Sequence, residues 1–263
     1  MKNDIKIIFV DIDWTIFNHS SFPSFYDFES IDALKKAQEQ GVKVFINTAR
    51  PYHSVEQIKL LEYFVPDGMI LCNGGLILNE DKVLYSSDIE VEVFERLSEL
   101  ALSNGLSLQG IRLHDSFMIA EENDAVRSLF TTFPEDMPPV EDYHNQKTVG
   151  ICLFAPKEYD ELFINNIPKN YVYFRYHDFG VDVAPGPHDK GEAIKIVLDK
   201  LNIPKDYAMA IGDDIVDIAM FKQVKYGVAM GNGHEDVLRS AHHVTSHINE
   251  HGVKQVIEEF VLK

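Results

Sequence analysis

Short apolar runs that end in polar residues recur along this chain, and this pattern constrains the fold more than any other feature. Near the N-terminus the runs cover residues 7–10, 43–46 and 69–72. Between them lie an expected loop over 18–28 and expected helices over 31–40, with Ser30 as the N-cap, and over 54–63. Continuous apolar strands suit a sheet covered on both faces, and strands that alternate with helices form parallel βαβ units. The sequence therefore predicts a doubly wound, parallel α/β sheet of the Rossmann-like type.

The same pattern returns near the C-terminus, after an expected helix N-cap at Asp189. The residues before it differ, because one amphipathic helix over 90–103 lies among short strand-like segments. These segments cover residues 76–78, 83–85, 117–119, 149–154, 172–176 and 181–183. We therefore predict an α/β domain built from residues 1–80 and 186–263, with an α+β domain of residues 81–185 inserted into it.

Acidic side chains follow two of the predicted strands. Asp11 and Asp13 come after the first strand, and Asp213 and Asp217 come after a late strand. Ligands of doubly wound sheets bind beyond the carboxyl ends of the strands, so we expect these carboxylates to gather at one edge. Like charges so close together need a cation, and oxygen donors without histidine or cysteine favour a hard ion. The sequence therefore predicts an Mg²⁺ site.

The spacing of Asp11 and Asp13 suggests a reaction on phosphorus. Two residues apart on an extended strand, both side chains project to the same side. One can attack phosphorus as a carboxylate while the other serves as acid and base, which gives an aspartyl-phosphate intermediate. Lys190 in the first turn of its helix adds a positive charge. The groups available to hold phosphate oxygens are Thr15, Thr48 and the backbone N–H groups of Trp14 and Ala49.

These segments, taken in order, resemble the haloacid dehalogenase-like phosphatase superfamily, most of all its Cof-type branch with a type II, subtype B cap. The matching motifs are Asp11-x-Asp13-x-Thr15, Thr48, Lys190 and Gly212-Asp213-x-x-x-Asp217. The resemblance covers essentially the whole chain. It implies the strand order 5-4-1-2-3 for the core sheet and assigns residues 81–185 to the cap.

The resemblance also implies a role for each matched residue. Asp11 would be the nucleophile and a metal ligand, and Asp13 would protonate the leaving alcohol and then activate water. The metal would be held by Asp11, the backbone carbonyl of Asp13 and Asp213, with support from Asp217. Thr48 and Lys190 would stabilise the phosphoryl group. The residues expected to contact the substrate are Trp14, Thr15, Ala49, Arg50 and Asn73.

The chain departs from the family pattern beside two motifs. Trp14, the one tryptophan, stands where the family has glycine, and Val216 stands where an asparagine precedes the last aspartate. Both changes leave the catalytic acids in place and bear on rate and substrate choice. Three functions stay open: Mg²⁺-dependent hydrolysis of a small phosphorylated metabolite such as a sugar phosphate, a phosphomutase reaction on a phosphorylated sugar, and a low-activity binding or regulatory role. The retained Asp11, Asp13, Lys190 and Asp213 weigh against the third.

The overall charge narrows the class of partner. The chain has 24 lysines and arginines against 42 aspartates and glutamates, a formal net charge of −18. Such a surface argues against nucleic-acid and anionic-membrane partners, and nothing in the sequence indicates an oligomeric state. No transmembrane segment or signal peptide is expected. Cys72 and Cys152 fit no metal or disulfide pattern, so we expect free thiols in a reducing cytoplasm.

Overall fold

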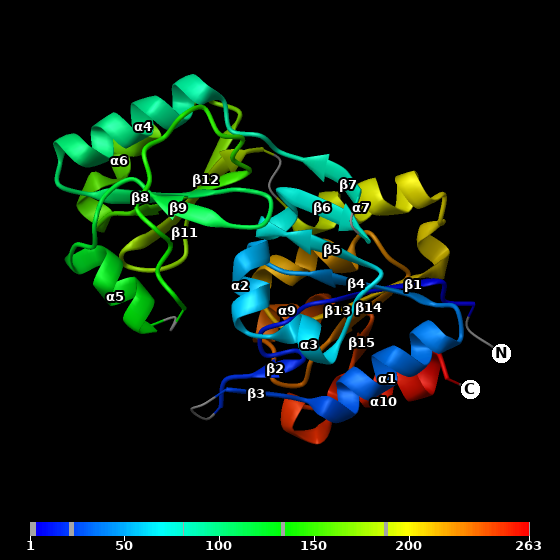
Figure 1. Cartoon of the computed structure of the whole chain (residues 1–263). Coiled ribbons are helices and arrows are strands. Elements are labelled where there is room, and N and C mark those ends of the chain that lie inside the picture. Colours follow the sequence, from blue (N-terminus) through cyan, green and yellow to red (C-terminus); the bar gives the residue numbers. More distant parts are fainter. Residues whose placement is uncertain (1–3, 21–23, 81, 133–134, 187–188, 263) are drawn as a thin grey trace. The chain divides into compact units, whose positions relative to one another are not determined.

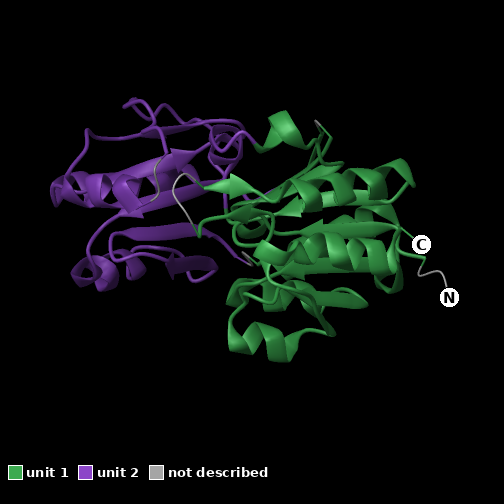
Figure 2. Ribbon diagram, turned by 90° about the horizontal axis from the view of Figure 1, so that it is seen from below, with its two compact units in different colours: residues 1–49, 60–85, 189–263 green, residues 50–59, 86–188 purple. Residues whose placement is uncertain are grey.

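The computed structural model describes residues 4–20, 24–80, 82–132, 135–186 and 189–262 of the chain (Figure 1). The chain divides into two compact units, which Figure 2 colours separately. The core unit comprises residues 1–49, 60–85 and 189–263, and the inserted unit comprises residues 50–59 and 86–188. The domain boundaries given above stay a prediction; residues 50–59, which the prediction places in the α/β domain, group here with the inserted unit.

An eight-stranded sheet forms the centre of the core unit, in the order β15-β14-β13-β1-β4-β5-β6-β7. Its strands are β1 (Ile7–Val10), β4 (Lys43–Asn47), β5 (Gly68–Leu71), β6 (Leu76–Asn79), β7 (Lys82–Ser86), β13 (Ala208–Gly212), β14 (Tyr226–Ala229) and β15 (His243–Val244). The strands from β15 to β5 pair in parallel, and β6 runs antiparallel to β5. The order β14-β13-β1-β4-β5 is the implied order 5-4-1-2-3, and the doubly wound α/β fold is confirmed.

Helices cover the two faces of this sheet (Figure 1). They are α1 (Phe28–Glu39), α3 (Leu60–Tyr63), α7 (Lys190–Leu201), α8 (Ile218–Phe221), α9 (Glu235–Ser240) and α10 (Gly252–Phe260). Apolar side chains of α7, α8 and α9 share one buried cluster with the sheet, and α1 packs beside α10. The side chain of Asp189 caps α7, as predicted, by accepting the N–H groups of Gly191 at 2.7 Å and Glu192 at 3.0 Å.

Two helix predictions are wrong in detail. The N-cap of α1 is Asp27 rather than Ser30, because the Asp27 carboxylate accepts the Ser30 N–H at 3.3 Å and so starts the helix three residues earlier. The expected helix over 54–63 is divided into α2 (Tyr52–Gln57) and α3. The division follows from Lys59, whose φ of 60° lies in the left-handed region and cannot continue a right-handed helix.

The expected loop over 18–28 contains a short β-hairpin. Its strands are β2 (Phe17–Asn18) and β3 (Phe25–Tyr26), which pair antiparallel. The rings of Phe17 and Tyr26 lie 4.7 Å apart and join the two strands at this pair. The hairpin follows the first acidic motif directly and carries His19.

The inserted unit contains a five-stranded antiparallel sheet in the order β11-β12-β10-β8-β9. The strands are β8 (Ser107–Ile111), β9 (Ser116–Met118), β10 (Gly150–Phe154), β11 (Tyr171–Arg175) and β12 (Gly180–Pro185). Helices α4 (Val91–Ser103) and α6 (Asp160–Ile164) share an apolar cluster with one face, and α5 (Asp124–Thr132) packs on the other. Strand β8 was not predicted, because Gln109 and Gly110 interrupt its apolar pattern.

Two further predictions concern the cysteines and the absence of membrane-spanning helices. Cys72 and Cys152 are both buried, and neither forms a disulfide within the described residues, as predicted. Within the described part of the chain, no helix combines the length and the apolar character that crossing a membrane requires.

Candidate active site

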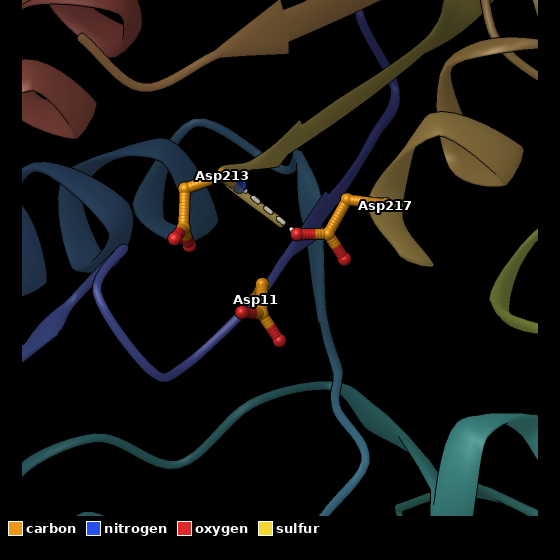
Figure 3. Close-up of side chains that lie close together, drawn as sticks. All are labelled: Asp11, Asp213 and Asp217. Atoms are coloured by element: carbon orange, nitrogen blue, oxygen red, sulfur yellow. Dashed lines mark hydrogen bonds between the residues drawn. The ribbon is translucent and has the colours of Figure 1, made fainter. Parts of the chain in front are cut away.

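The acidic residues that follow β1 and β13 lie together, because these parallel strands are neighbours and end at the same edge. Asp11 follows β1 directly, and its N–H donates to the Ile211 carbonyl of β13 at 3.0 Å. After β13 the chain turns back through a 3₁₀ helix over Ile215–Asp217. Figure 3 shows the carboxyl groups of Asp11, Asp213 and Asp217 around one point, and one oxygen of each lies within 4.8 Å of the other two.

Asp217 holds the loop that follows β13. Its Oδ2 accepts the N–H groups of Asp213 at 2.9 Å and Asp214 at 3.0 Å, so a fully buried carboxylate fixes the backbone of the motif. This close approach depends on Gly212, because a Cβ atom there would overlap the Asp217 carboxylate. A residue with a side chain at Gly212 would push Asp217 away from the loop it holds.

Lys190 is the buried cation of the site. It opens α7, and its Nζ donates to Asp11 Oδ1 at 2.8 Å and to Asp217 Oδ1 at 2.7 Å. Burial by itself lowers the pKa of Lys190, but Asp11 and Asp217 outweigh that effect and hold the pKa above its ordinary value. The side chain is 3% exposed, so solvent screens this charge very little. Lys190 is therefore a fixed positive charge at neutral pH.

The neighbouring acids carry more negative charge than Lys190 offsets. Burial raises the pKa of Asp11 well above its ordinary value, although Lys190 acts in the opposite direction. Burial also raises the pKa of Asp213, to about 7, with a further contribution from Asp217. A divalent cation would relieve this repulsion. The donors are all carboxylate oxygens, without histidine or cysteine, and this chemistry fits a hard ion such as Mg²⁺.

The loop after β1 is held by hydrogen bonds that the sequence did not reveal. The Thr15 hydroxyl donates to Asp213 Oδ1 at 2.9 Å, and the Trp14 N–H donates to the Phe17 carbonyl at 2.8 Å. Both groups were predicted to hold phosphate oxygens, and in the structure both bind protein atoms. Thr15 thus connects the two acidic motifs, and the role of the two groups in holding phosphate stays a prediction.

Trp14 occupies a position that favours glycine. Its φ of 59° lies in the left-handed region, which costs a bulky residue on the order of 1–3 kcal/mol. Neighbours hold it there: the Trp14 carbonyl accepts the Asn232 side-chain amide at 2.8 Å, and the indole packs on the His19 ring at 5.4 Å. The side chain is 39% exposed, so a large aromatic face borders the site.

A pocket of about 530 Å³ opens over these residues within the core unit. Its lining comprises Asp11, Asp13, Trp14, Thr48, Ala49, Lys190, Asp213, Asp214, Val216, Asn232, Gly233 and His234. Seven residues predicted for the site are therefore brought together, from strands at both ends of the sequence. Among the described residues, the lining excludes four others from the prediction, Thr15, Arg50, Asn73 and Asp217.

Arg50 lies in the other unit. It was predicted to contact the substrate, but the structure groups it with the inserted unit, where its guanidinium donates to Glu135 and to the Ser54 hydroxyl, both at 2.7 Å. A partner 85 positions away along the chain could not be anticipated from the local sequence.

Asn232 is a pocket residue that the prediction of site residues missed. Its side chain accepts the Ile248 N–H at 2.9 Å and donates to the Trp14 carbonyl, which joins the C-terminal region to the first loop. The same rule that found Asp11 would have found it, since Asn232 follows the end of β14 by three residues at the same edge of the sheet. His234 also lines the pocket, and nothing comparable in the sequence indicated it.

The fold and the pocket agree with a comparison of the sequence with known families. Residues 8–257 match the haloacid dehalogenase-like hydrolase family. The match spans nearly the whole chain, so the protein belongs to this family, and the predicted superfamily membership is confirmed. With its relatives taken into account, the protein is a haloacid dehalogenase-like phosphatase.

Individual relatives extend this result. The chain is 27% identical to 5-amino-6-(5-phospho-D-ribitylamino)uracil phosphatase YcsE of Bacillus subtilis (strain 168), over 98% of this chain and 97% of that protein. The structure of a hypothetical protein from Geobacillus kaustophilus HTA426 superposes with a TM-score of 0.89, at 29% identity, over 98% and 100% of the two chains. The subclass IIB sugar phosphatase BT4131 superposes with a TM-score of 0.78, at 25% identity, over 97% and 98%.

Proposed function

We propose that the protein hydrolyses phosphate monoesters of small metabolites, with sugar phosphates as the first class to test. The observation that carries this proposal is Asp11, a buried carboxylate that lines the pocket and lies 2.8 Å from Lys190 Nζ. Two relatives support the substrate class, since one is named for a sugar phosphatase activity and the other for a phosphorylated ribityl compound. The pocket volume of about 530 Å³ suits a compound of that size.

Two chemical steps follow from the arrangement of Asp11 and Asp13. In the first, the Asp11 carboxylate attacks phosphorus and the bond from phosphorus to the alcohol oxygen breaks, while Asp13 donates a proton to that oxygen. In the second, Asp13 removes a proton from water, and the water oxygen attacks phosphorus. The bond from phosphorus to the Asp11 oxygen then breaks, which returns the free carboxylate and releases inorganic phosphate.

Fixed charges in the pocket support both steps. Lys190 holds Asp11 through a 2.8 Å hydrogen bond and keeps its positive charge next to the incoming phosphoryl group. Mg²⁺ would be held by Asp11, Asp213 and the Asp13 carbonyl, with Asp217 fixing the loop that presents Asp213. When bound, the ion supplies positive charge that offsets the charge of the transferred phosphoryl group.

Removal of the metal tests this proposal without a mutation. We expect a chelator to lower kcat/KM for sugar phosphates by about a hundredfold or more, and Mg²⁺ to restore it, since a catalytic cation contributes several kcal/mol to such a reaction. Mg²⁺ should also raise Tm, because it binds the clustered carboxylates of the folded state only. This increase in Tm should be lost in Asp213→Asn and retained in Asp32→Asn, which removes an exposed acid on α1.

The identity of the product separates the alternatives. Release of inorganic phosphate from sugar phosphates, dependent on Mg²⁺, supports the phosphatase. A rearranged sugar phosphate without net release of phosphate would replace it with a phosphomutase. Full turnover in excess chelator would contradict the metal assignment, and binding of sugar phosphates without turnover would favour the binding role.

A further inference from the structure

We propose that His19 is a positioning residue, which holds the carboxyl group of Asp13 for its work as general acid and base. This inference rests on the proposed function, because that function gives Asp13 the acid and base role. The observation is a hydrogen bond of 2.7 Å between His19 Nε2 and Asp13 Oδ1. Asp13 lines the pocket, and His19 directly follows β2 in the β2–β3 hairpin.

Neighbouring groups fix the His19 ring from three sides. Its Nδ1 lies 3.0 Å from the Ser24 hydroxyl, on the other side of the hairpin. The Phe17 ring meets it edge-on, at 4.9 Å between centroids, and the Trp14 indole packs against it at 5.4 Å. Because the position and plane of the ring are fixed, the direction in which Nε2 points is fixed as well.

The hydrogen-bond partners also determine which nitrogen carries the proton. An ionised carboxylate only accepts hydrogen bonds, so Nε2 must donate to Asp13. In neutral His19, Nδ1 then lacks a hydrogen and accepts the hydroxyl hydrogen of Ser24. A carboxyl group protonated on Oδ2 still accepts a hydrogen bond at Oδ1, so the contact with Nε2 can persist when Asp13 acts as the acid. The chain Ser24–His19–Asp13 therefore orients the carboxyl group in both steps, much as a third residue orients the base in other catalytic arrangements.

This pair contributes little to folding. The side chains of His19 and Asp13 are 29% and 32% exposed, so water screens their interaction and competes for the hydrogen bond. A contact of this kind, at the edge of a pocket and between two half-exposed groups, is better explained by a need to orient Asp13 than by stability. The two explanations differ in what they predict for esters with different leaving groups.

The test compares esters with good and poor leaving groups. The oxygen of a sugar alcohol must be protonated as it leaves, whereas p-nitrophenolate leaves without a proton. A misplaced general acid should therefore lower kcat/KM for a sugar phosphate about tenfold or more, and lower kcat/KM for p-nitrophenyl phosphate less than about threefold. The ratio kcat/KM is the relevant quantity, because it reports the steps up to departure of the alcohol.

Two substitutions of His19 separate the role of its nitrogens. The amide of His19→Gln reaches close to the position of Nε2 and can still donate to Asp13, so most of the activity on sugar phosphates should be retained. The amide of His19→Asn lies near the position of Nδ1 and cannot reach Asp13, so the loss described above should appear. Inhibition by inorganic phosphate should stay within about threefold of the native value in both variants, because the groups that bind phosphate are untouched.

A matched control is available in the same unit. His251 Nδ1 lies 2.7 Å from Asp27 Oδ1, which gives a histidine–carboxylate pair of equal length between α10 and α1. His251 has a φ of 59°, a conformation that glycine adopts readily. His251→Gly therefore removes a similar contact without backbone strain, and it should leave both esters unaffected.

The outcomes distinguish a failure of the inference from a failure of the proposed function. Asp13→Asn should itself lower kcat/KM mainly for sugar phosphates; an equal loss of kcat/KM on both esters would overturn the acid role of Asp13 and this inference with it. If Asp13→Asn behaves as expected but His19→Asn changes neither ester, or lowers both equally, the inference is wrong and the proposed function stands. Equal losses in His19→Gln and His19→Asn on the sugar phosphate would also overturn it.

Discussion

Asp11→Asn is expected to lower kcat for every phosphate ester by at least about a thousandfold, since its amide cannot form the phosphorylated intermediate. The fold should survive this change. Burial raises the pKa of Asp11, which means that its ionised form is less stable in the folded chain than in the unfolded chain at neutral pH. A neutral amide removes that cost, so in the absence of Mg²⁺ the Tm should stay the same or increase.

Phosphate release and thermal unfolding of the same samples measure both effects. Asp32→Asn is the control, because it makes the same substitution at an exposed position of α1 and should change neither quantity. A decrease in activity together with a large decrease in Tm would mean that Asp11 acts chiefly on the fold. An Asp11→Asn variant that retains a tenth of the native activity would exclude Asp11 as the nucleophile.

Lys190→Met is expected to reduce the free energy of unfolding by about 3–5 kcal/mol at pH 7. Methionine matches the length of the side chain but leaves Asp11 and Asp217 buried without the cation that both now contact. The loss is not reduced by screening, since Lys190 is 3% exposed. Turnover should fall as well, because the positive charge beside the phosphoryl group is gone.

The pH dependence of this effect has a definite sign. In the native protein burial already raises the pKa of Asp11 while Lys190 lowers it, so the variant should raise that pKa further. An acid with a raised folded-state pKa destabilises the fold above that pKa and stops doing so below its unfolded-state pKa. The difference in the free energy of unfolding between the variant and the native protein should therefore narrow as the pH falls from 7 towards 5.

Urea unfolding in the absence of Mg²⁺ measures the gap at each pH. Lys195→Met serves as the control, since it removes an exposed lysine from the same helix. An unfolding free energy equal to that of the native protein at pH 7 would contradict the buried charge balance described above. A gap that widens on acidification would contradict the assigned sign.

The central sheet and its strand order could be predicted because each apolar run ends in a polar residue at one edge. The helix predictions that were wrong concern the start of α1 and the break before α3. Asp27 and Ser30 are both good N-cap residues, and only the folded chain shows that Asp27 starts α1. Lysine does not favour the left-handed conformation that Lys59 adopts, so the sequence pattern did not predict the break before α3.

The acids of the site were predictable for the same reason as the sheet. Asp11 and Asp213 follow neighbouring parallel strands, so topology alone brings them together. The contacts of side chains on irregular segments were not predictable. The pairing of Arg50 with Glu135 depends on chain 85 positions away, and the contact of His19 with Asp13 depends on the hairpin formed by β2 and β3.

Direct detection of the phosphorylated residue tests the central claim. The Asp13→Asn variant should accumulate the intermediate from p-nitrophenyl phosphate, because this leaving group needs no acid while hydrolysis of the intermediate needs a base. After an acid quench and digestion, mass spectrometry should find one phosphoryl group on the peptide that contains Asp11, assigned to that residue, and none in Asp11→Asn. Release of p-nitrophenol without a phosphorylated protein, or a phosphoryl group on another residue, would contradict the account.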